Sequence, residues 1–148
     1  MSTDPTLTPQ IIGQAEKTMN TILFRLLAGP GLTEAQWITL TLTAAGGGAT
    51  ARGQLVDEVA HALKISQAQA QEHLASLVAA HLVQEPGNDA GPVRFTTAGT
   101  EVFGQIRGAT AEVVKRLWGD LPAEDLATAG RVLSIITERA NAELAGAT

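Results

Sequence analysis

The sequence predicts a mainly α-helical fold that carries one small β-hairpin. Apolar residues recur at steps of three and four along most of the 148 residues, which is the spacing of one helix face. Two Ser/Thr-x-x-Gln segments, starting at Thr33 and Ser66, have the pattern of a helix-capping box. Between residues 82 and 96 the periodicity changes around a turn-rich stretch, Pro86-Gly87-Asn88-Asp89-Ala90-Gly91, which is typical of a hairpin.

Composition excludes several classes of protein. The chain has a mass of 15.3 kDa, a net charge of −5 and 45% hydrophobic residues, which are enough for a packed core. The absence of cysteine excludes disulfides and a thiol redox switch, and 3% aromatic residues argue against a base-stacking surface for single strands. The first basic residue is Lys17 and no apolar run could span a bilayer, so we expect a soluble cytoplasmic protein without membrane contact.

The N-terminal third predicts two helices. The first runs from about Thr8 to Ala28, with Thr8 as cap and Pro9 in the first helical position. The second begins after Thr33, which forms a capping box with Gln36, and stops at three consecutive glycines, residues 46–48. Residues 49–51 are short and fit an isolated edge strand.

The middle of the chain predicts a helix-turn-helix followed by a hairpin. One helix covers about residues 53–63, Lys64-Ile65 is a tight turn, and Ser66 opens the next helix with Gln69 as its capping-box partner. Residues 82–85 and 93–96 read as the two strands of the hairpin. This order is that of a winged helix-turn-helix.

The tail predicts two long amphipathic helices, one closed by Gly119 and one beginning at Pro122. A single copy would leave their apolar stripes partly exposed, so we expect a two-fold dimer. The predicted organisation is one winged-helix domain, 1–148, with a DNA-reading module at about 50–98 and dimerisation helices at about 8–45 and 99–145.

Several segments in this order resemble the MarR/SlyA family of winged-helix transcription regulators. They are Leu32-Thr33-x-x-Gln36-Trp37-x-x-Leu40, Val59-Ala60-x-x-Leu63-x-Ile65-Ser66, Leu77 with Leu82-Val83, and Phe95-Thr96-x-x-Gly99. The resemblance implies a homodimer that binds palindromic double-stranded DNA, often as a repressor. It also implies a small aromatic or anionic ligand that binds between the dimer helices and the reading module.

The reading module departs from the family in its charge. Between Thr50 and Ala98 three basic residues face five acidic ones, a net charge of −2. Asp89 is followed by Ala90-Gly91 where the family's wing carries Asp-x-Arg, and His81 stands where the family often has glycine. Since Lys and Arg contacts to phosphate supply most sequence-independent affinity, we expect a shallow salt dependence of binding.

The expected DNA contacts lie at the start of the second helix of the module and around it. An N-terminal turn in the major groove reads bases, and glutamine can pair with adenine. The candidates are Arg52, Lys64, Ser66, Gln67, Gln69, Gln71, His73 and Arg94. The alternative is a polar surface, in which Gln69 serves only the capping box and Arg94 pairs with Glu85 across the hairpin.

Met19, Leu23, Trp37 and Phe103 are the candidate ligand-binding residues, expected to meet where the first, second and fifth helices join. The alternative for each is plain core packing. The three histidines, His61, His73 and His81, lack the spacing of a metal site, so we expect no metal and no cofactor.

The sequence therefore predicts a dimeric DNA-binding transcription regulator, repressing and modulated by a small hydrophobic or aromatic effector. The alternative is a degenerate winged helix that serves protein interaction or ligand binding, as the acidic module would favour. No nucleophile–base set or carboxylate pair indicates an enzyme.

Overall fold

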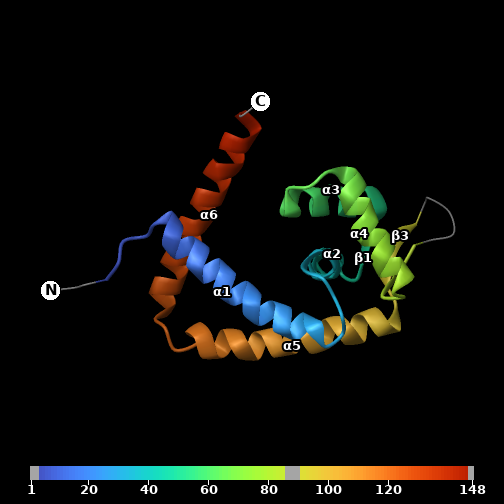
Figure 1. Cartoon of the computed structure of the whole chain (residues 1–148), viewed down its shortest axis with the longest axis horizontal. Coiled ribbons are helices and arrows are strands. Elements are labelled where there is room, and N and C mark those ends of the chain that lie inside the picture. Colours follow the sequence, from blue (N-terminus) through green and yellow to red (C-terminus); the bar gives the residue numbers. More distant parts are fainter. Residues whose placement is uncertain (1–3, 86–90, 147–148) are drawn as a thin grey trace. The chain divides into compact units, whose positions relative to one another are not determined.

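The computed structural model describes residues 4–85 and 91–146 and confirms a mainly helical chain with a small antiparallel sheet (Figure 1). The elements are α1 (Pro9–Ala28), α2 (Glu34–Ala45), β1 (Ala49–Ala51), α3 (Arg52–Leu63), α4 (Gln67–Ala79), β2 (Val83–Gln84), β3 (Pro92–Phe95), α5 (Thr97–Trp118) and α6 (Ala123–Gly146). The predicted turn residues 86–90 lie outside the described part of the chain.

The predicted helix caps are confirmed. The hydroxyl of Thr8 accepts the backbone N–H of Ile11 at 3.1 Å, which starts α1. Both capping boxes are complete, Thr33 with Gln36 at the start of α2 and Ser66 with Gln69 at the start of α4. Each box satisfies two backbone N–H groups that the helix itself leaves unpaired, so the sequence sets where these helices begin.

The sheet has three strands in the order β1-β3-β2, all antiparallel. The expected edge strand at residues 49–51 forms, but it is paired and not isolated, because Thr50 lies opposite Val93 of β3. On the other side, Gln84 of β2 lies opposite Arg94. Of the two expected hairpin strands, β2 is shorter by one residue at each end, and β3 has the expected length but begins and ends one residue earlier. β3 is paired on both sides.

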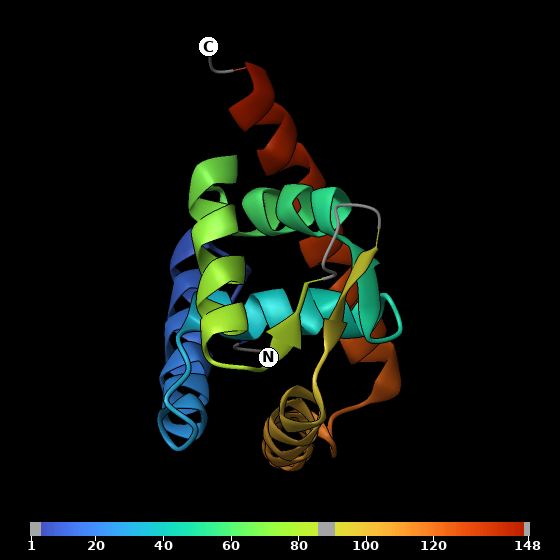
Figure 2. The ribbon, with the colours of Figure 1, turned by 90° about the vertical axis from the view of Figure 1, so that its right-hand side faces the viewer.

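The core of the winged module lies where α2, α3, α4 and the sheet meet. Its fully buried side chains include Leu40 of α2, Leu55 of α3, Leu74 and Leu77 of α4, and Val93 of β3. Lys64 makes the turn between α3 and α4 with a left-handed backbone, φ 57°, and Ile65 N–H donates to Ala60 O at 3.0 Å. Figure 2 shows α3 and α4 lying crosswise, which leaves the first turn of α4 outside the core.

The start of α5 is locked to the end of α4. The hydroxyl of Thr96 accepts Gly99 N–H at 2.9 Å and donates to the carbonyl of His81 at 2.6 Å. A Cβ on Gly99 would lie 1.9 Å from the carbonyl oxygen of Leu82. Only glycine allows the backbone of α5 to lie this close to the carbonyl of Leu82.

The chain divides into two compact units, residues 1–110 and 111–148. The first contains α1, α2, the winged module and the first part of α5. The second contains the end of α5 and all of α6, a helix with no buried residue. None of the described helices is both long and apolar enough to cross a bilayer.

Candidate DNA-binding interface and adjoining pocket

The first turns of α4 present their polar side chains to solvent. Ser66, Gln67, Gln69 and Gln71 are all exposed, whereas Ala70, which lies between them, is fully buried. The amide of Gln69 accepts Ser66 N–H at 3.1 Å, so its side chain serves the capping box. Ser66 likewise uses its hydroxyl on Gln69 N–H. Of the predicted base contacts at this end, only Gln67 and Gln71 therefore take no part in the capping box.

Gln67 and Gln71 differ in their surroundings. The side-chain nitrogen of Gln67 donates a hydrogen bond to the carboxylate of Asp57, which lies on α3. Gln71 makes no side-chain hydrogen bond to any residue in the described ranges. The first amide is held by a neighbouring helix, and the second is free to turn.

His73 lies further along α4 and is half-buried. Its backbone carbonyl accepts the hydroxyl of Ser76 at 2.7 Å, and that hydroxyl accepts the side-chain amide of Gln36 at 3.0 Å. Gln36 belongs to the capping box of α2, so this short chain of hydrogen bonds joins α2 to the middle of α4.

The three predicted cationic contacts have different partners. Arg52 Nε donates to Glu85 at 3.0 Å, with both side chains partly exposed. The expected alternative for Arg94, a pair with Glu85 across the hairpin, is therefore wrong, because the register places Gln84 opposite Arg94 and turns Glu85 to Arg52. Lys64 Nζ donates to the carbonyl of His61 at 3.0 Å. Arg94 is exposed and has no side-chain partner among the described residues.

An aromatic pocket lies in the first unit, between α2 and α5. Trp37 and Phe103 stack with ring centroids 5.2 Å apart, and the guanidinium of Arg107 lies 5.7 Å from the Phe103 ring centre. The hollow has a volume of about 410 Å³. Its lining residues are Trp37, Thr41, Ala44, Ala45, Phe103 and Arg107.

The structure brings together only two of the four predicted ligand-binding residues. Trp37 and Phe103 share the pocket, whereas Met19 and Leu23 lie on α1 and do not line it. Met19 is 41% exposed, which leaves it out of the core as well. A ring, a cation and a threonine hydroxyl around one hollow suit a planar ligand with an anionic or polar group.

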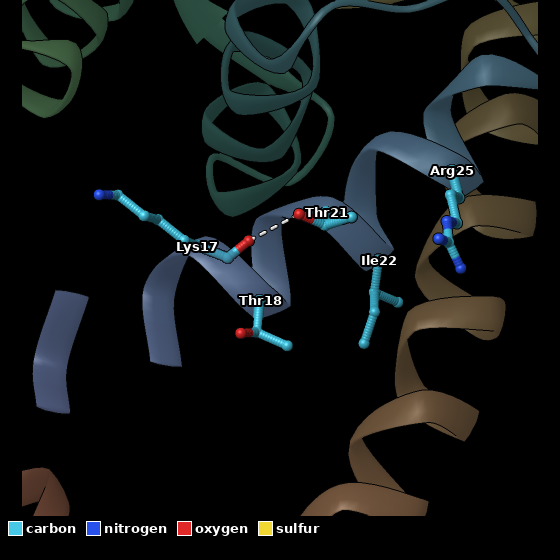
Figure 3. A pocket seen from close by; sticks show the side chains of 5 residues that line it. All are labelled: Lys17, Thr18, Thr21, Ile22 and Arg25. Carbon is cyan, nitrogen blue, oxygen red and sulfur yellow. Dashed lines mark hydrogen bonds between the residues drawn. The ribbon is translucent and has the colours of Figure 1, made fainter. Parts of the chain in front are cut away.

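A second hollow of about 330 Å³ runs along α1 (Figure 3). Lys17, Ile22 and Arg25 line it together with two threonines. The threonine hydroxyls donate to backbone carbonyls of their own helix, Thr18 to Gln14 and Thr21 to Lys17. All five residues come from a single helix, so this hollow is a shallow surface feature without the enclosing walls of the aromatic pocket.

No group of three or more His, Asp or Glu side chains within residues 4–85 and 91–146 is arranged to hold a metal ion. The three histidines fall on different parts of the module, His61 near the end of α3, His73 within α4 and His81 just after it.

Two residues of the site were missed by sequence reasoning. Arg107 stands four residues after Phe103 on α5, the spacing at which two side chains share a helix face, and that signal could have found it. Asp57 stands ten residues before Gln67 on another helix. Its contact depends on how α3 crosses α4, which no local pattern records.

No protein-family model matches the chain, and no curated protein matches it in sequence. Several solved structures, however, are similar to it in fold. S. aureus MepR in complex with DNA has a TM-score of 0.71 and 17% identity, covering 89% of this chain and 96% of that one. NadR in complex with 4-hydroxyphenylacetate has a TM-score of 0.70 and 19% identity, covering 88% and 95%.

The reduced form of MarR from E. coli is also similar, with a TM-score of 0.65 and 19% identity over 90% of this chain and 95% of that one. At identities of 17–19%, this likeness concerns the course of the backbone. The chain has the winged helix-turn-helix fold of the MarR-family regulators.

Proposed function

We propose that this protein is a homodimeric, sequence-specific DNA-binding transcription regulator of the MarR type. The observation that carries the proposal is the start of α4, where two exposed glutamines flank a helix face that is buried in the core through Ala70, Leu74 and Leu77. A rigid helix with a polar N-terminal turn is what major-groove reading requires. The structural neighbour MepR, whose structure is a DNA complex, supports the same use of the fold.

Dimer formation would supply the second reading head. In the second unit, α6 has no buried residue, and Leu133, Ile136 and Leu144 are between 37% and 62% exposed. Such an apolar stripe favours burial against the same helix of another copy. We keep the predicted division into a reading module, about 50–98, and dimerisation helices, about 8–45 and 99–145. Two-fold symmetry then implies a palindromic operator.

The aromatic pocket is the proposed effector site. Trp37 and Phe103 offer ring faces and Arg107 offers a positive charge. NadR, a structural neighbour, was solved with the small aromatic anion 4-hydroxyphenylacetate. We expect a ligand in this pocket to lower the affinity for the operator and so to relieve repression. The protein would have no enzymatic activity and would act in the cytoplasm.

The decisive experiment is retention of DNA by the purified full-length protein. Sheared genomic DNA is passed over it at low salt, retained fragments are sequenced, and a duplex carrying the recovered motif is tested in a gel-shift assay. We expect a palindromic motif that competes better than random duplex. No specific shift even at low salt would contradict the proposal and favour the alternative, a winged helix used for protein interaction, which the −2 charge of the module supports.

The effector site has its own test. The Trp118→Phe variant leaves Trp37 as the only tryptophan, so its fluorescence reports on the pocket. We expect quenching by 4-hydroxyphenylacetate, weakened about tenfold by Arg107→Ala, on the scale of one lost charged contact. Arg116→Ala, an exposed arginine of the same helix that does not line the pocket, is the matched control. Equal quenching in both variants would remove Arg107 from the site.

A further inference from the structure

The contact between Gln67 and Asp57 has a chemical consequence for base reading. An ionised carboxylate has no hydrogen to donate, so it accepts only. The group of Gln67 that faces Asp57 must therefore be the NH₂ group, and the structure shows the nitrogen donating to the carboxylate. The two ends of the amide are not interchangeable here, as they are for a glutamine whose partner both donates and accepts.

The orientation of the amide decides which bases it can read. With its nitrogen turned to α3, Gln67 presents its carbonyl oxygen outward, and the Asp57 carboxylate beside it adds further acceptors. In the major groove, adenine and cytosine offer an exocyclic amino group as donor, whereas guanine O6 and thymine O4 are acceptors. The outward surface therefore carries several acceptors and, beside them, only the second N–H of the Gln67 amide as a donor, which favours adenine and cytosine over guanine and thymine.

We infer that Asp57 is a positioning residue that makes Gln67 selective for bases with an exocyclic amino group. The inference rests on the proposed function, because it needs α4 in the major groove. Gln71, one turn further along the same helix, makes no such contact within the described residues and keeps both orientations. The two glutamines, alike in sequence, then read different sets of bases.

α3 offers a matched control for Asp57. Glu58, the next residue, accepts the side-chain amide of Gln54 at 3.0 Å. It is the same kind of amide–carboxylate contact, but both partners lie on α3, so the bond does not join α3 to α4. Asp57→Asn and Glu58→Gln each remove one negative charge from one helix, so a general electrostatic effect on DNA affinity should appear in both variants.

The test is selection of binding sites from a randomised double-stranded DNA library with the full-length protein and three variants. Gln67→Ala identifies the position that Gln67 reads, as the one whose preference collapses. There we expect wild type to prefer adenine or cytosine about tenfold over guanine or thymine. In Asp57→Asn this preference should fall to about twofold, since an asparagine accepts either end of the amide. Glu58→Gln should keep it.

The outcomes separate the two proposals. A motif at which Gln67 reads guanine or thymine, or an Asp57→Asn motif identical to that of wild type, overturns the role of Asp57 and leaves DNA binding intact. Loss of preference at every position in Asp57→Asn, or a lower thermal midpoint than Glu58→Gln, would assign Asp57 a structural role and also overturn the inference. Failure of wild type to select any motif removes the proposed function together with it.

Discussion

His81 adopts a backbone conformation that side chains rarely take. Its φ is 62°, in the left-handed region, just after α4 ends. Leu82 N–H donates to Leu77 O at 3.1 Å and His81 N–H to Val78 O at 3.0 Å, the double hydrogen bond of a Schellman helix end. The helix end has the usual hydrogen bonds, but its left-handed position is occupied by His81, where glycine is preferred.

His81→Gly should therefore stabilise the protein. Removing the side chain relieves about 1–2 kcal/mol of left-handed strain, and the greater entropy of glycine in the unfolded chain offsets about 0.5–1 kcal/mol of it. We expect the free energy of unfolding in urea to rise by about 0.5–1 kcal/mol. His73→Gly, in the interior of α4, should change it in the opposite direction. A loss of stability in both variants would contradict the strain at His81.

Gly99 and Gly104 lie on the same helix and should respond oppositely to alanine. The added Cβ at Gly99 would collide with the Leu82 carbonyl, so Gly99→Ala should cost about 2–3 kcal/mol as α5 is pushed away. At Gly104 nothing lies within 4 Å of the added carbon, so Gly104→Ala should stabilise α5 by about 1 kcal/mol. Thermal unfolding of the two variants beside wild type measures both. Equal effects would show that the close approach at Gly99 is not structural.

Sequence reasoning succeeded at this scale where the interaction is local. Thr8, Thr33 and Ser66 cap helices as predicted, because a cap and its N–H partner are three residues apart. The alternative for Arg94, a pair with its hairpin neighbour Glu85, was wrong, because Glu85 binds Arg52, 33 residues away. Which of two cations an exposed carboxylate meets depends on tertiary placement.

Among the elements, α2 connects the aromatic pocket to α4. Trp37 lines the pocket, and the adjacent Gln36 reaches Ser76 of α4 with its nitrogen while its oxygen caps α2. The capping box was predictable from four residues of sequence. The bond to Ser76 was not, since it requires knowing that α2 packs on α4.

Gln36→Ala should cost more stability than Gln69→Ala. Both substitutions remove the glutamine of a capping box, worth about 1 kcal/mol. Only the first also removes a partly buried bond between helices, worth about another 0.5–1.5 kcal/mol. Urea denaturation of the two variants gives the difference. If it is zero, the bond between α2 and α4 contributes nothing to stability.

For the molecule as a whole, electrostatics would set the character of the proposed DNA binding. The module between Thr50 and Ala98 has a net charge of −2, two of its three cations are engaged within the protein, and only Arg94 has no partner among the described residues. The Arg52–Glu85 pair is on the surface and worth at most about 1 kcal/mol, so a phosphate can compete for that arginine. The net charge could be predicted from the sequence alone, whereas the structure shows that Arg52 and Lys64 already have partners within the protein.

The affinity should consequently depend weakly on salt. If Arg94 of each protomer is the only phosphate contact, the slope of log affinity against log salt concentration is about −2 for the dimer. Arg94→Ala should then abolish this salt dependence and weaken binding to all DNA sequences alike. Fluorescence anisotropy at several salt concentrations measures the slope. A value steeper than about −6 would require cations from outside the module and contradict this account.

The dimer proposal makes a prediction for α6. Ile136→Glu places a charge on the apolar stripe and should raise the dimer dissociation constant about 100-fold or more, since desolvating an unpaired charge costs several kcal/mol. Ala142→Glu, on the opposite side of the helix by its spacing, should leave it unchanged. Analytical ultracentrifugation distinguishes the two. Wild type that sediments as one chain at micromolar concentration would refute the dimer.

The short edge strand β1 protects the sheet from aggregation by edge-to-edge strand pairing. β1 ends the sheet with three residues, bounded by glycines before it and by α3 directly after it. A strand from another chain needs a longer row of unpaired backbone N–H and C=O groups to pair with, so this edge strand is a poor template for it. A chain rich in alanine, leucine and valine thus offers little template for amyloid-like stacking at this edge of its sheet.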